Sequence, residues 1–211
     1  MRHAQRIASF VVLIAFSLAP ASATTAQQHN RVTADEATAG WVLIFDGTSL
    51  TGWAPRLDGQ WEVADGTISA VPDAGRGFMA TTAHYADFQL TVDFWIDDTA
   101  NSGVFLRCPA EGAISQGNAF EVNIFDPHTT WPTGSINEVA KIQTVPQTAG
   151  KWNTFEITAN GDHLEALQAT PRGYLLHLSC SHRLVSRASL KGDHPSWRSA
   201  TFKNSWTVRT A

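Results

Sequence analysis

Two short apolar segments of this 211-residue chain carry an arginine, a carboxylate and an amide at the spacing of a β-strand. The polar residues are Arg107 in segment 101–107, and Glu121 and Asn123 in segment 120–126. If the segments are neighbouring strands of one sheet, the alternation of faces brings these three side chains onto a single surface. A carboxylate beside a guanidinium suits acid–base chemistry, and the alternative is an exposed sheet face with an ordinary ion pair. The spacing alone leaves both possibilities open.

The other residues of these segments indicate the strands that would position such a site. Gly103 and Phe105 are expected on the same face as Arg107, because they lie four and two residues before it. The opposite face is expected to point into the core, and its members are Val104, Leu106, Cys108, Phe120, Val122 and Ile124. This separation of polar and apolar faces predicts half-buried strands.

The rest of the chain between residues 41 and 157 has the pattern of an all-β protein. Asp65-Gly66 is a hairpin signal between two alternating segments. The clearest strand is 88–96, which is apolar at even positions and polar at odd positions except for Trp95. Trp95 either covers a neighbouring loop or stacks on a bound sugar ring. Helical periodicity is absent after the amino-terminal segment, so we predict a two-sheet antiparallel β-sandwich of the concanavalin-like type.

The amino terminus has the features of a secretory signal peptide. Arg2 and Arg6 precede the apolar stretch 7–18, and small residues lead to an A-x-A type cleavage point at Ala23. We therefore expect cleavage after Ala23 and a periplasmic or secreted product. The apolar stretch is short for a bilayer span and no second long one follows, so no membrane association is expected after signal removal.

The predicted organisation is a signal peptide (1–23), a flexible linker (24–39) and a single sandwich domain (40–211). The linker is rich in Ala, Thr and Gln without apolar periodicity. Within the domain, segment 165–190 loses the strand alternation, which fits either a compensated reading-frame error or a drifted sheet edge. A net charge of −4 offers no basic surface for nucleic acid, whereas eight tryptophans suit a carbohydrate partner. The oligomeric state is left undetermined.

Cysteine, metal and cofactor signals are weak. Cys108 and Cys180 are the only cysteines, and we expect separate thiols because one lies on the presumed core face and the other in the atypical segment. The run Asp126-Pro127-His128 is expected to form a turn and not a metal site. The sequence has no phosphate loop, nucleophile elbow or nucleotide fingerprint, so no cofactor is predicted.

Several of these segments together resemble the 3-keto-disaccharide hydrolase family, whose members are secreted concanavalin-like β-sandwiches. The matching segments follow the order of the family and are 40–47, 50–53, 101–107, 121–126, 133–136 and 150–157. The family usually continues with two apolar strands joined by an Asn-Gly turn. Segment 165–190 departs from that pattern, which puts one sheet edge in doubt.

The resemblance implies an enzyme that acts on 3-keto-glycosides. The carbonyl at C3 makes the proton at C2 acidic, so the glycosidic oxygen at C1 can leave by elimination before water adds. This route requires a base at C2, a cationic or hydrogen-bonding group on the enolate oxygen, and an acid for the leaving group. The expected catalytic residues are Glu121 as base, Arg107 as enolate stabiliser, and Asp126 or His194 as acid. The expected substrate-binding residues are Asn101, Asn123, Ser135 and Trp95.

Three alternatives stay open. Glu121 and Asp126 could be the carboxylate pair of an ordinary glycosidase, but five residues of extended strand separate their α-carbons by about 17 Å, so a bend would be required. A non-catalytic, lectin-like glycan-binding module would use the same polar face with Trp95. A purely structural exported domain would scatter these polar residues without a pocket. Burial or a strongly shifted pKa of Glu121 would favour the enzyme. The sequence does not specify the sugar, its linkage or its anomer.

Overall fold

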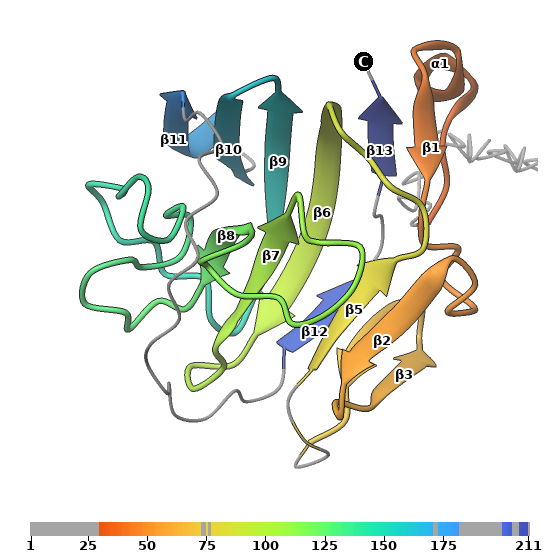
Figure 1. The fold of residues 1–211 in the computed structure, drawn as a ribbon, viewed down its shortest axis with the longest axis horizontal. Coiled ribbons are helices and arrows are strands. Elements are labelled where there is room, and N and C mark those ends of the chain that lie inside the picture. Colours follow the sequence, from red (N-terminus) through yellow and green to blue (C-terminus); the bar gives the residue numbers. More distant parts are fainter. Residues whose placement is uncertain are drawn as a thin grey trace, which may run out of the picture.

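The computed structural model describes residues 30–72, 75, 77–170, 173–181, 200–203 and 207–210, with side chains up to residue 168. The regular elements of these residues are one short helix, α1 (Ala34–Thr38), and a series of strands joined by turns and loops (Figure 1). The strands are β1 (Trp41–Leu43), β2 (Trp53–Leu57), β3 (Trp61–Ala64), β4 (Thr67–Ala70), β5 (Gly77–Thr81), β6 (Phe88–Ile96), β7 (Ser102–Leu106), β8 (Phe120–Ile124), β9 (Trp152–Asn160), β10 (His163–Thr170), β11 (Gly173–Ser181), β12 (Ala200–Lys203) and β13 (Thr207–Thr210).

The strands are arranged in two layers. One layer is a large sheet of order β11-β10-β9-β6-β12-β4-β3, in which β13 also pairs with β6 and β1. The pairs β2-β5 and β7-β8 form the other layer and lie in front of the large sheet in Figure 1. The paired strands within each sheet run antiparallel. The predicted antiparallel β-sandwich is therefore confirmed.

The core lies between the layers and is built by strand alternation. Along β6 every second residue is buried, from Phe88 to Ile96, as predicted for this segment. These side chains belong to one cluster with the inward-facing residues of the opposite layer, which are Val104, Leu106, Phe120, Val122 and Ile124. Since apolar burial is the main favourable term in folding, this cluster holds β7 and β8 against the large sheet. The outward faces of β7 and β8 are thereby fixed in position.

The turn between β3 and β4 is the predicted two-residue hairpin. Asp65 and Gly66 have φ angles of 49° and 72°, and the flanking Ala64 and Thr67 are paired. Positive φ at both central positions matches the right-handed twist of the strands, and Asp-Gly is a favoured pair for that conformation. The sequence prediction is confirmed here.

Part of the predicted flexible linker is ordered as helix α1. The Thr33 side chain accepts a hydrogen bond from the Glu36 backbone, and the Glu36 carboxylate accepts one from the Thr33 backbone at 2.8 Å. This capping box stabilises a single turn without any apolar periodicity, which is why the sequence pattern did not indicate a helix. Residues 1–29, with the predicted signal peptide, lie outside the described residues. No helix in the described part of the chain is long and apolar enough to cross a membrane.

Segment 165–190 pairs as a hairpin over much of its length, despite its irregular sequence. Strand β10 pairs with β9 on one side and β11 on the other, with a register shift between Gln168 and Ala169. Main-chain hydrogen bonds depend little on side-chain identity, so a ladder can persist where alternation is lost. Residues 182–199, including His194, lie outside the described residues, as does the side chain of Cys180.

Candidate active site

The outward face of the β7-β8 pair carries the candidate site. Glu121 lies directly opposite Phe105, and Asn123 lies opposite Gly103. Because directly opposed residues of antiparallel strands project on the same side of a sheet, these four residues share one face. The predicted pairing of the two segments is confirmed, as is the position of Glu121 and Asn123 away from the core cluster.

Glu121 is a buried carboxylate held by two amide groups. Its side chain is 1% exposed. Oε2 accepts a hydrogen bond from Gln116 Nε2 at 2.7 Å and a second from Asn137 Nδ2 at 2.7 Å. The Asn137 backbone N–H also donates to the Glu121 carbonyl at 2.9 Å, which fixes Asn137 beside the carboxylate. Both partners are neutral, so neither supplies a positive charge.

Burial therefore dominates the proton affinity of Glu121. Desolvation raises the pKa of Glu121 above its ordinary value, and the hydrogen bonds from Gln116 and Asn137 oppose that rise only in part. A carboxylate with a raised pKa is a stronger base when it is ionised. The site thus contains a buried carboxyl group whose side-chain partners within the described residues are neutral amides.

Space for the Glu121 carboxylate comes from a glycine in the opposing strand. A Cβ built at Gly103 would lie 2.5 Å from Glu121 Oε1 and 2.8 Å from Glu121 Cγ. Real Cβ atoms do not approach so closely, so the carboxylate occupies volume that any larger residue at position 103 would take. Both side-chain hydrogen bonds of Glu121 within the described residues are accepted by Oε2, and none by Oε1.

Gln116 and Asn137 were not among the residues singled out from the sequence. Asn137 is 8% exposed, and its Oδ1 atom is buried without a hydrogen-bond partner among the described residues. A buried acceptor without a donor is uncommon, and this oxygen is able to accept a hydrogen bond from a ligand hydroxyl. Asn137 directly follows the matched segment 133–136, which was its one sequence signal. Gln116 lies in an exposed loop and had none.

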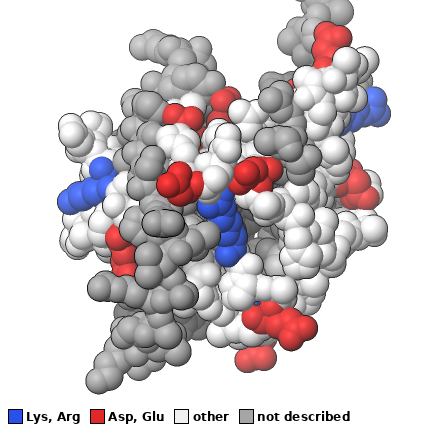
Figure 2. All heavy atoms as spheres, turned by 45° about the horizontal axis from the view of Figure 1, so that its top comes forward, with Lys and Arg blue, Asp and Glu red and all other residues white. Residues whose placement is uncertain are grey.

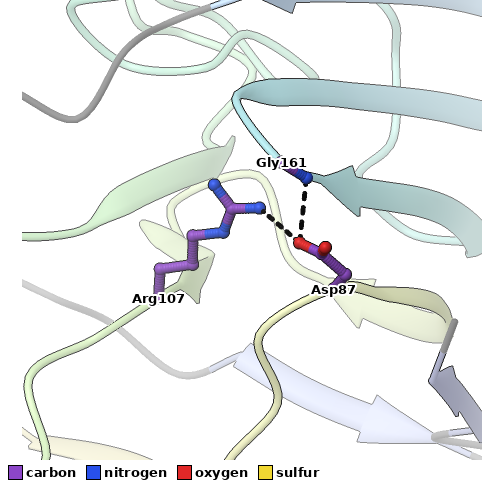
Figure 3. Close-up of polar contacts among 3 residues, drawn as sticks. All are labelled: Asp87, Arg107 and Gly161. Atoms are coloured by element: carbon purple, nitrogen blue, oxygen red, sulfur yellow. Dashed lines mark hydrogen bonds and ion pairs between the residues drawn. The ribbon is translucent and has the colours of Figure 1, made fainter.

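The structure does not bring Arg107 to Glu121. Arg107 Nη2 is 3.2 Å from Asp87 Oδ1, and the same oxygen accepts the Gly161 backbone N–H at 2.9 Å (Figure 3). The physical reason is local: β7 ends at Leu106, and Arg107 has a φ of 54°. This left-handed conformation interrupts the alternation that predicted Arg107 on the face of Gly103 and Phe105.

Asp126 lies beyond the end of β8 and ties two loops together. Its Oδ1 accepts from the hydroxyls of Thr133 and Thr148, each at 2.6 Å. Its Oδ2 accepts from the backbone of Thr148 at 2.6 Å and of Ala149 at 3.4 Å. With both oxygens occupied by donors, Asp126 has the surroundings of a carboxylate that organises loops.

Asn123 and Ser135 are also engaged within the protein. Asn123 is 2% exposed, donates from Nδ2 to the Trp131 carbonyl, and donates from its backbone to the Ser135 carbonyl at 2.9 Å. Ser135 is fully buried, and its Oγ accepts from the Ile142 backbone at 3.4 Å. These contacts position the loops that cover the outward face of β8. Asn101 is half-buried at the start of β7 and lines a cavity described below.

Trp95 lies on the other side of the sandwich. It alternates with the buried residues of β6, so it projects away from the core on the large sheet. Its neighbour there is Trp152, which is directly opposite in β9 and 45% exposed. Glu121 projects outward from the opposite layer, and the two predicted site residues are therefore separated by the core.

His128 and Cys108, the remaining residues considered from the sequence, have contacts typical of structural roles. His128 Nδ1 accepts the backbone N–H groups of Thr130 and Trp131 at 3.1 and 3.0 Å, which is a turn arrangement as predicted. Cys108 is a free, half-buried thiol, and burial raises its pKa to about 11. On the face shown in Figure 2, the described acidic and basic side chains are interspersed around a hollow, without an extended patch of one sign.

Comparisons with known proteins agree with this geometry. Residues 40–169 match the family described as 3-keto-alpha-glucoside-1,2-lyase-like domain. The fold is similar to that of a provisionally assigned glycosyl hydrolase from Parabacteroides distasonis ATCC 8503, with a TM-score of 0.66, 20% identity, and coverage of 87% of this chain and 99% of the other. A second such protein from the same organism has a TM-score of 0.59, 19% identity, and coverage of 81% and 99%.

A more distant fold neighbour is the exoplasmic/lumenal domain of VIP36 in its Ca²⁺/Man3GlcNAc-bound form. It has a TM-score of 0.50 and 11% identity, and the match covers 80% of this chain and 87% of that domain. No curated protein sequence matches this chain. These likenesses establish the lectin-like sandwich fold, and the family match covers both strands of the candidate site, β7 and β8.

Proposed function

Because this chain belongs to the family of 3-keto-alpha-glucoside-1,2-lyase-like domains, we propose that it is an enzyme that cleaves 3-keto-glycosides by elimination across C1 and C2. The observation that carries this proposal is the environment of Glu121. Its carboxylate is 1% exposed, its pKa is raised by burial, and its contacts are two neutral amides. A binding module needs no such group, whereas proton abstraction beside a carbonyl does.

The proposed reaction begins at Glu121 Oε1, which removes the proton from C2 of the 3-keto sugar. The electrons of the broken C2–H bond form an enolate with the C3 carbonyl. The enolate collapses, C1–C2 becomes a double bond, and the C1–O bond breaks. The proton held by Glu121 then passes to the departing oxygen, so Glu121 ends the sequence ionised again. Addition of water across C1 and C2 would complete a net hydrolysis.

Enolate stabilisation is assigned to the amides that already contact Glu121. When Glu121 takes the proton, it loses its negative charge and becomes a weaker acceptor. The N–H groups of Gln116 and Asn137 are then available to the enolate oxygen, where charge is developing. The unpartnered Asn137 Oδ1 would accept a sugar hydroxyl. Asp126 is assigned the role of fixing the loops, because threonine and backbone donors occupy both of its oxygens.

The experiment that tests this proposal compares a 3-keto-disaccharide with its unoxidised parent. We expect the purified protein to release a monosaccharide from the keto form only, and to exchange the C2 proton with deuterium in D₂O. Glu121→Gln should lower both rates by about 10²- to 10⁴-fold, because glutamine keeps the shape but cannot accept the proton. Glu62→Gln, at an exposed position of β3, is the matched control and should keep wild-type rates.

A glycan-binding module is the second candidate function. The observation in its favour is the tryptophan pair on the outer face of the large sheet, where Trp95 lies opposite Trp152. Flat aromatic surfaces of this kind pack on sugar rings. Under this alternative, Trp152→Ala would abolish glycan binding, and wild-type protein would release no sugar from any keto substrate. Turnover that depends on Glu121 would exclude it as the main function.

We also propose that the product is exported to the periplasm or medium. The support is the sequence pattern of residues 1–23, in which two arginines precede an apolar stretch and a small-residue cleavage point. An exported enzyme would meet 3-keto-glycosides outside the cytoplasm.

A further inference from the structure

A cavity of about 510 Å³ lies between the two layers of the sandwich, beside the edge of β7 that faces away from β8. Core-facing side chains of the large sheet and of β7 contribute to it, among them Leu90 and Leu106. The volume is within the range of about 300–1,000 Å³ that is common for small-molecule sites. Packed cores rarely leave voids much larger than a water molecule, so this cavity calls for an explanation.

The cavity wall is rich in aromatic rings. Its aromatic members are Trp53, Trp61, Phe78, Tyr85, Phe88 and Phe105. Phe78 and Phe105 meet edge to face with their centroids 5.2 Å apart, so they join β5 to β7 across the wall. The Trp61 Nε1 atom is buried and has no hydrogen-bond partner among the described residues. These features favour an aromatic ligand that also carries an acceptor oxygen.

The charged side chains that line the cavity within the described residues are positive. Arg56 and Arg107 line the cavity together with the exposed His84, and the described lining contains no aspartate or glutamate. Arg56 is occupied by the backbone carbonyls of Ala110 and Gly112. These contacts occupy both terminal nitrogens of Arg56, so Arg107 has more N–H donors left for a ligand.

Most N–H groups of the Arg107 guanidinium have no hydrogen-bond acceptor within the described residues. Its side chain is 12% exposed, and its one recorded polar contact within the described residues is the Asp87 oxygen at 3.2 Å (Figure 3). A guanidinium has five N–H donors in a planar fork and prefers a bidentate anion. Asp87 is 42% exposed, and Nη2 is the Arg107 nitrogen that contacts it, so most of the guanidinium donors remain for another acceptor.

The cavity adjoins the site at Glu121 but is not lined by its carboxylate. Glu121, Gln116 and Asn137 are not among its described lining residues. Strand β7 borders both: Val104 and Leu106 line the cavity from the core face, and Gly103 and Phe105, which share the outward face with Glu121, line it as well. Binding of a ligand to Arg107 and the aromatic wall does not require turnover at Glu121.

We propose that this cavity binds a small aromatic carboxylate, with the carboxylate on the Arg107 guanidinium and the ring among the aromatic side chains of the wall. An apolar ring gains from removal from water, and a carboxylate matches the planar fork of arginine. A neutral sugar would leave Arg107 without its anion and would place many hydroxyls against apolar rings.

The test is isothermal titration of the wild-type protein with trans-cinnamate, cinnamyl alcohol and 3-cyclohexylpropanoate. We expect one molecule of cinnamate to bind per chain, and the other two probes to bind more weakly. The alcohol lacks the charge and the cyclohexyl acid lacks the aromatic ring. Equal binding of cinnamate and the alcohol, or no detectable binding of cinnamate, would overturn the proposal.

Three variants make the assignment specific. Arg107→Gln should weaken cinnamate binding by about 10- to 100-fold, the usual loss for charge-assisted hydrogen bonds. Asp87→Asn should tighten it, because asparagine keeps an acceptor for the Gly161 N–H and removes the carboxylate that competes for Arg107. Lys151→Gln removes an exposed charge outside the cavity and should change nothing.

The tighter cinnamate binding expected for Asp87→Asn still tests the proposal if Arg107→Gln folds poorly. Unchanged binding in a folded Arg107→Gln variant would contradict the proposal, as would unchanged or weaker binding in Asp87→Asn. A melting curve for each variant reports whether it is folded. Because no 3-keto sugar is present, failure here is separate from failure of the proposed reaction.

Discussion

Gly103 lies directly against the Glu121 carboxylate, so close that a Cβ at position 103 would be 2.5 Å from Oε1. The glycine has no positive φ, which means that space and not backbone conformation excludes a side chain there. The pair thus links the backbone of β7 to the position of the proposed base.

Gly103→Ala is expected to displace the Glu121 carboxylate. A methyl group at that distance must push the carboxylate aside, and small displacements of a catalytic group cost large factors in rate. We expect a fall in kcat of at least about tenfold on a 3-keto-disaccharide. A double-mutant cycle with Glu121→Ala is the control, because removing the carboxylate should relieve the stability cost of the methyl group. Strict additivity of the two stability changes would contradict the contact.

Glu121→Gln is expected to stabilise the protein at neutral pH. The folded state holds the Glu121 proton to a higher pH than the unfolded state, whose pKa is the ordinary 4.5. Between 4.5 and the raised pKa, the unfolded state binds fewer protons, so the free energy of unfolding of the wild type falls as pH rises.

Glutamine does not titrate, so the variant should lack this fall. Melting temperatures from about pH 4 to about pH 8 for wild type, Glu121→Gln and Glu62→Gln would show it. Parallel curves for all three proteins would mean that Glu121 is not the group responsible.

Gln116→Ala is expected to move the pH dependence of the reaction to higher pH. The Gln116 amide stabilises the ionised carboxylate and lowers the pKa of Glu121. Its removal should raise that pKa further, so the rise of kcat/KM with pH should occur later. Gln116 is exposed, and the fold should tolerate its loss. A pH–rate profile identical to that of the wild type would exclude a contact between the two side chains in solution.

Asp126→Ala is expected to destabilise the protein by about 2–4 kcal/mol, since several donors lose their acceptor at once. The donors are the hydroxyls of Thr133 and Thr148 and the backbone N–H groups of Thr148 and Ala149. Urea unfolding measures this change. If Asp126 served instead as the acid for the leaving group, the variant would lose turnover while keeping wild-type stability.

Cells that make the full chain are expected to export a product that begins at Thr24. Amino-terminal sequencing of the protein from the periplasm or medium checks this outcome. A folded product that retains Met1 would contradict it.

Strand alternation was sufficient to predict much of the fold. It indicated strand β6, whose burial alternates along its whole length, and the Asp65-Gly66 hairpin between β3 and β4. It also indicated that Glu121 and Asn123 leave the core face of β8. These features follow from a period of two residues, which a sequence displays directly.

The hydrogen-bond partners of Glu121 cannot be predicted from the two-residue period of a strand. Gln116 and Asn137 belong to irregular segments, whose path depends on long-range contacts and not on local pattern. The departure of Arg107 from its predicted face comes from a single left-handed residue, which alternation assumes to be absent. The side of the sandwich on which Trp95 lies depends on how the two layers pack, and the sequence shows only that Trp95 leaves the core.

The left-handed backbone at Arg107 ends one short strand that borders both proposed sites. Gly103 lies against the Glu121 carboxylate at one end of the strand, and four residues later Arg107 lines the cavity. A shift of β7 along its own axis would move Gly103 and Arg107 together. The proposed base and the proposed anion anchor thus depend on the position of one short strand, so a displacement of that strand would alter both sites at once.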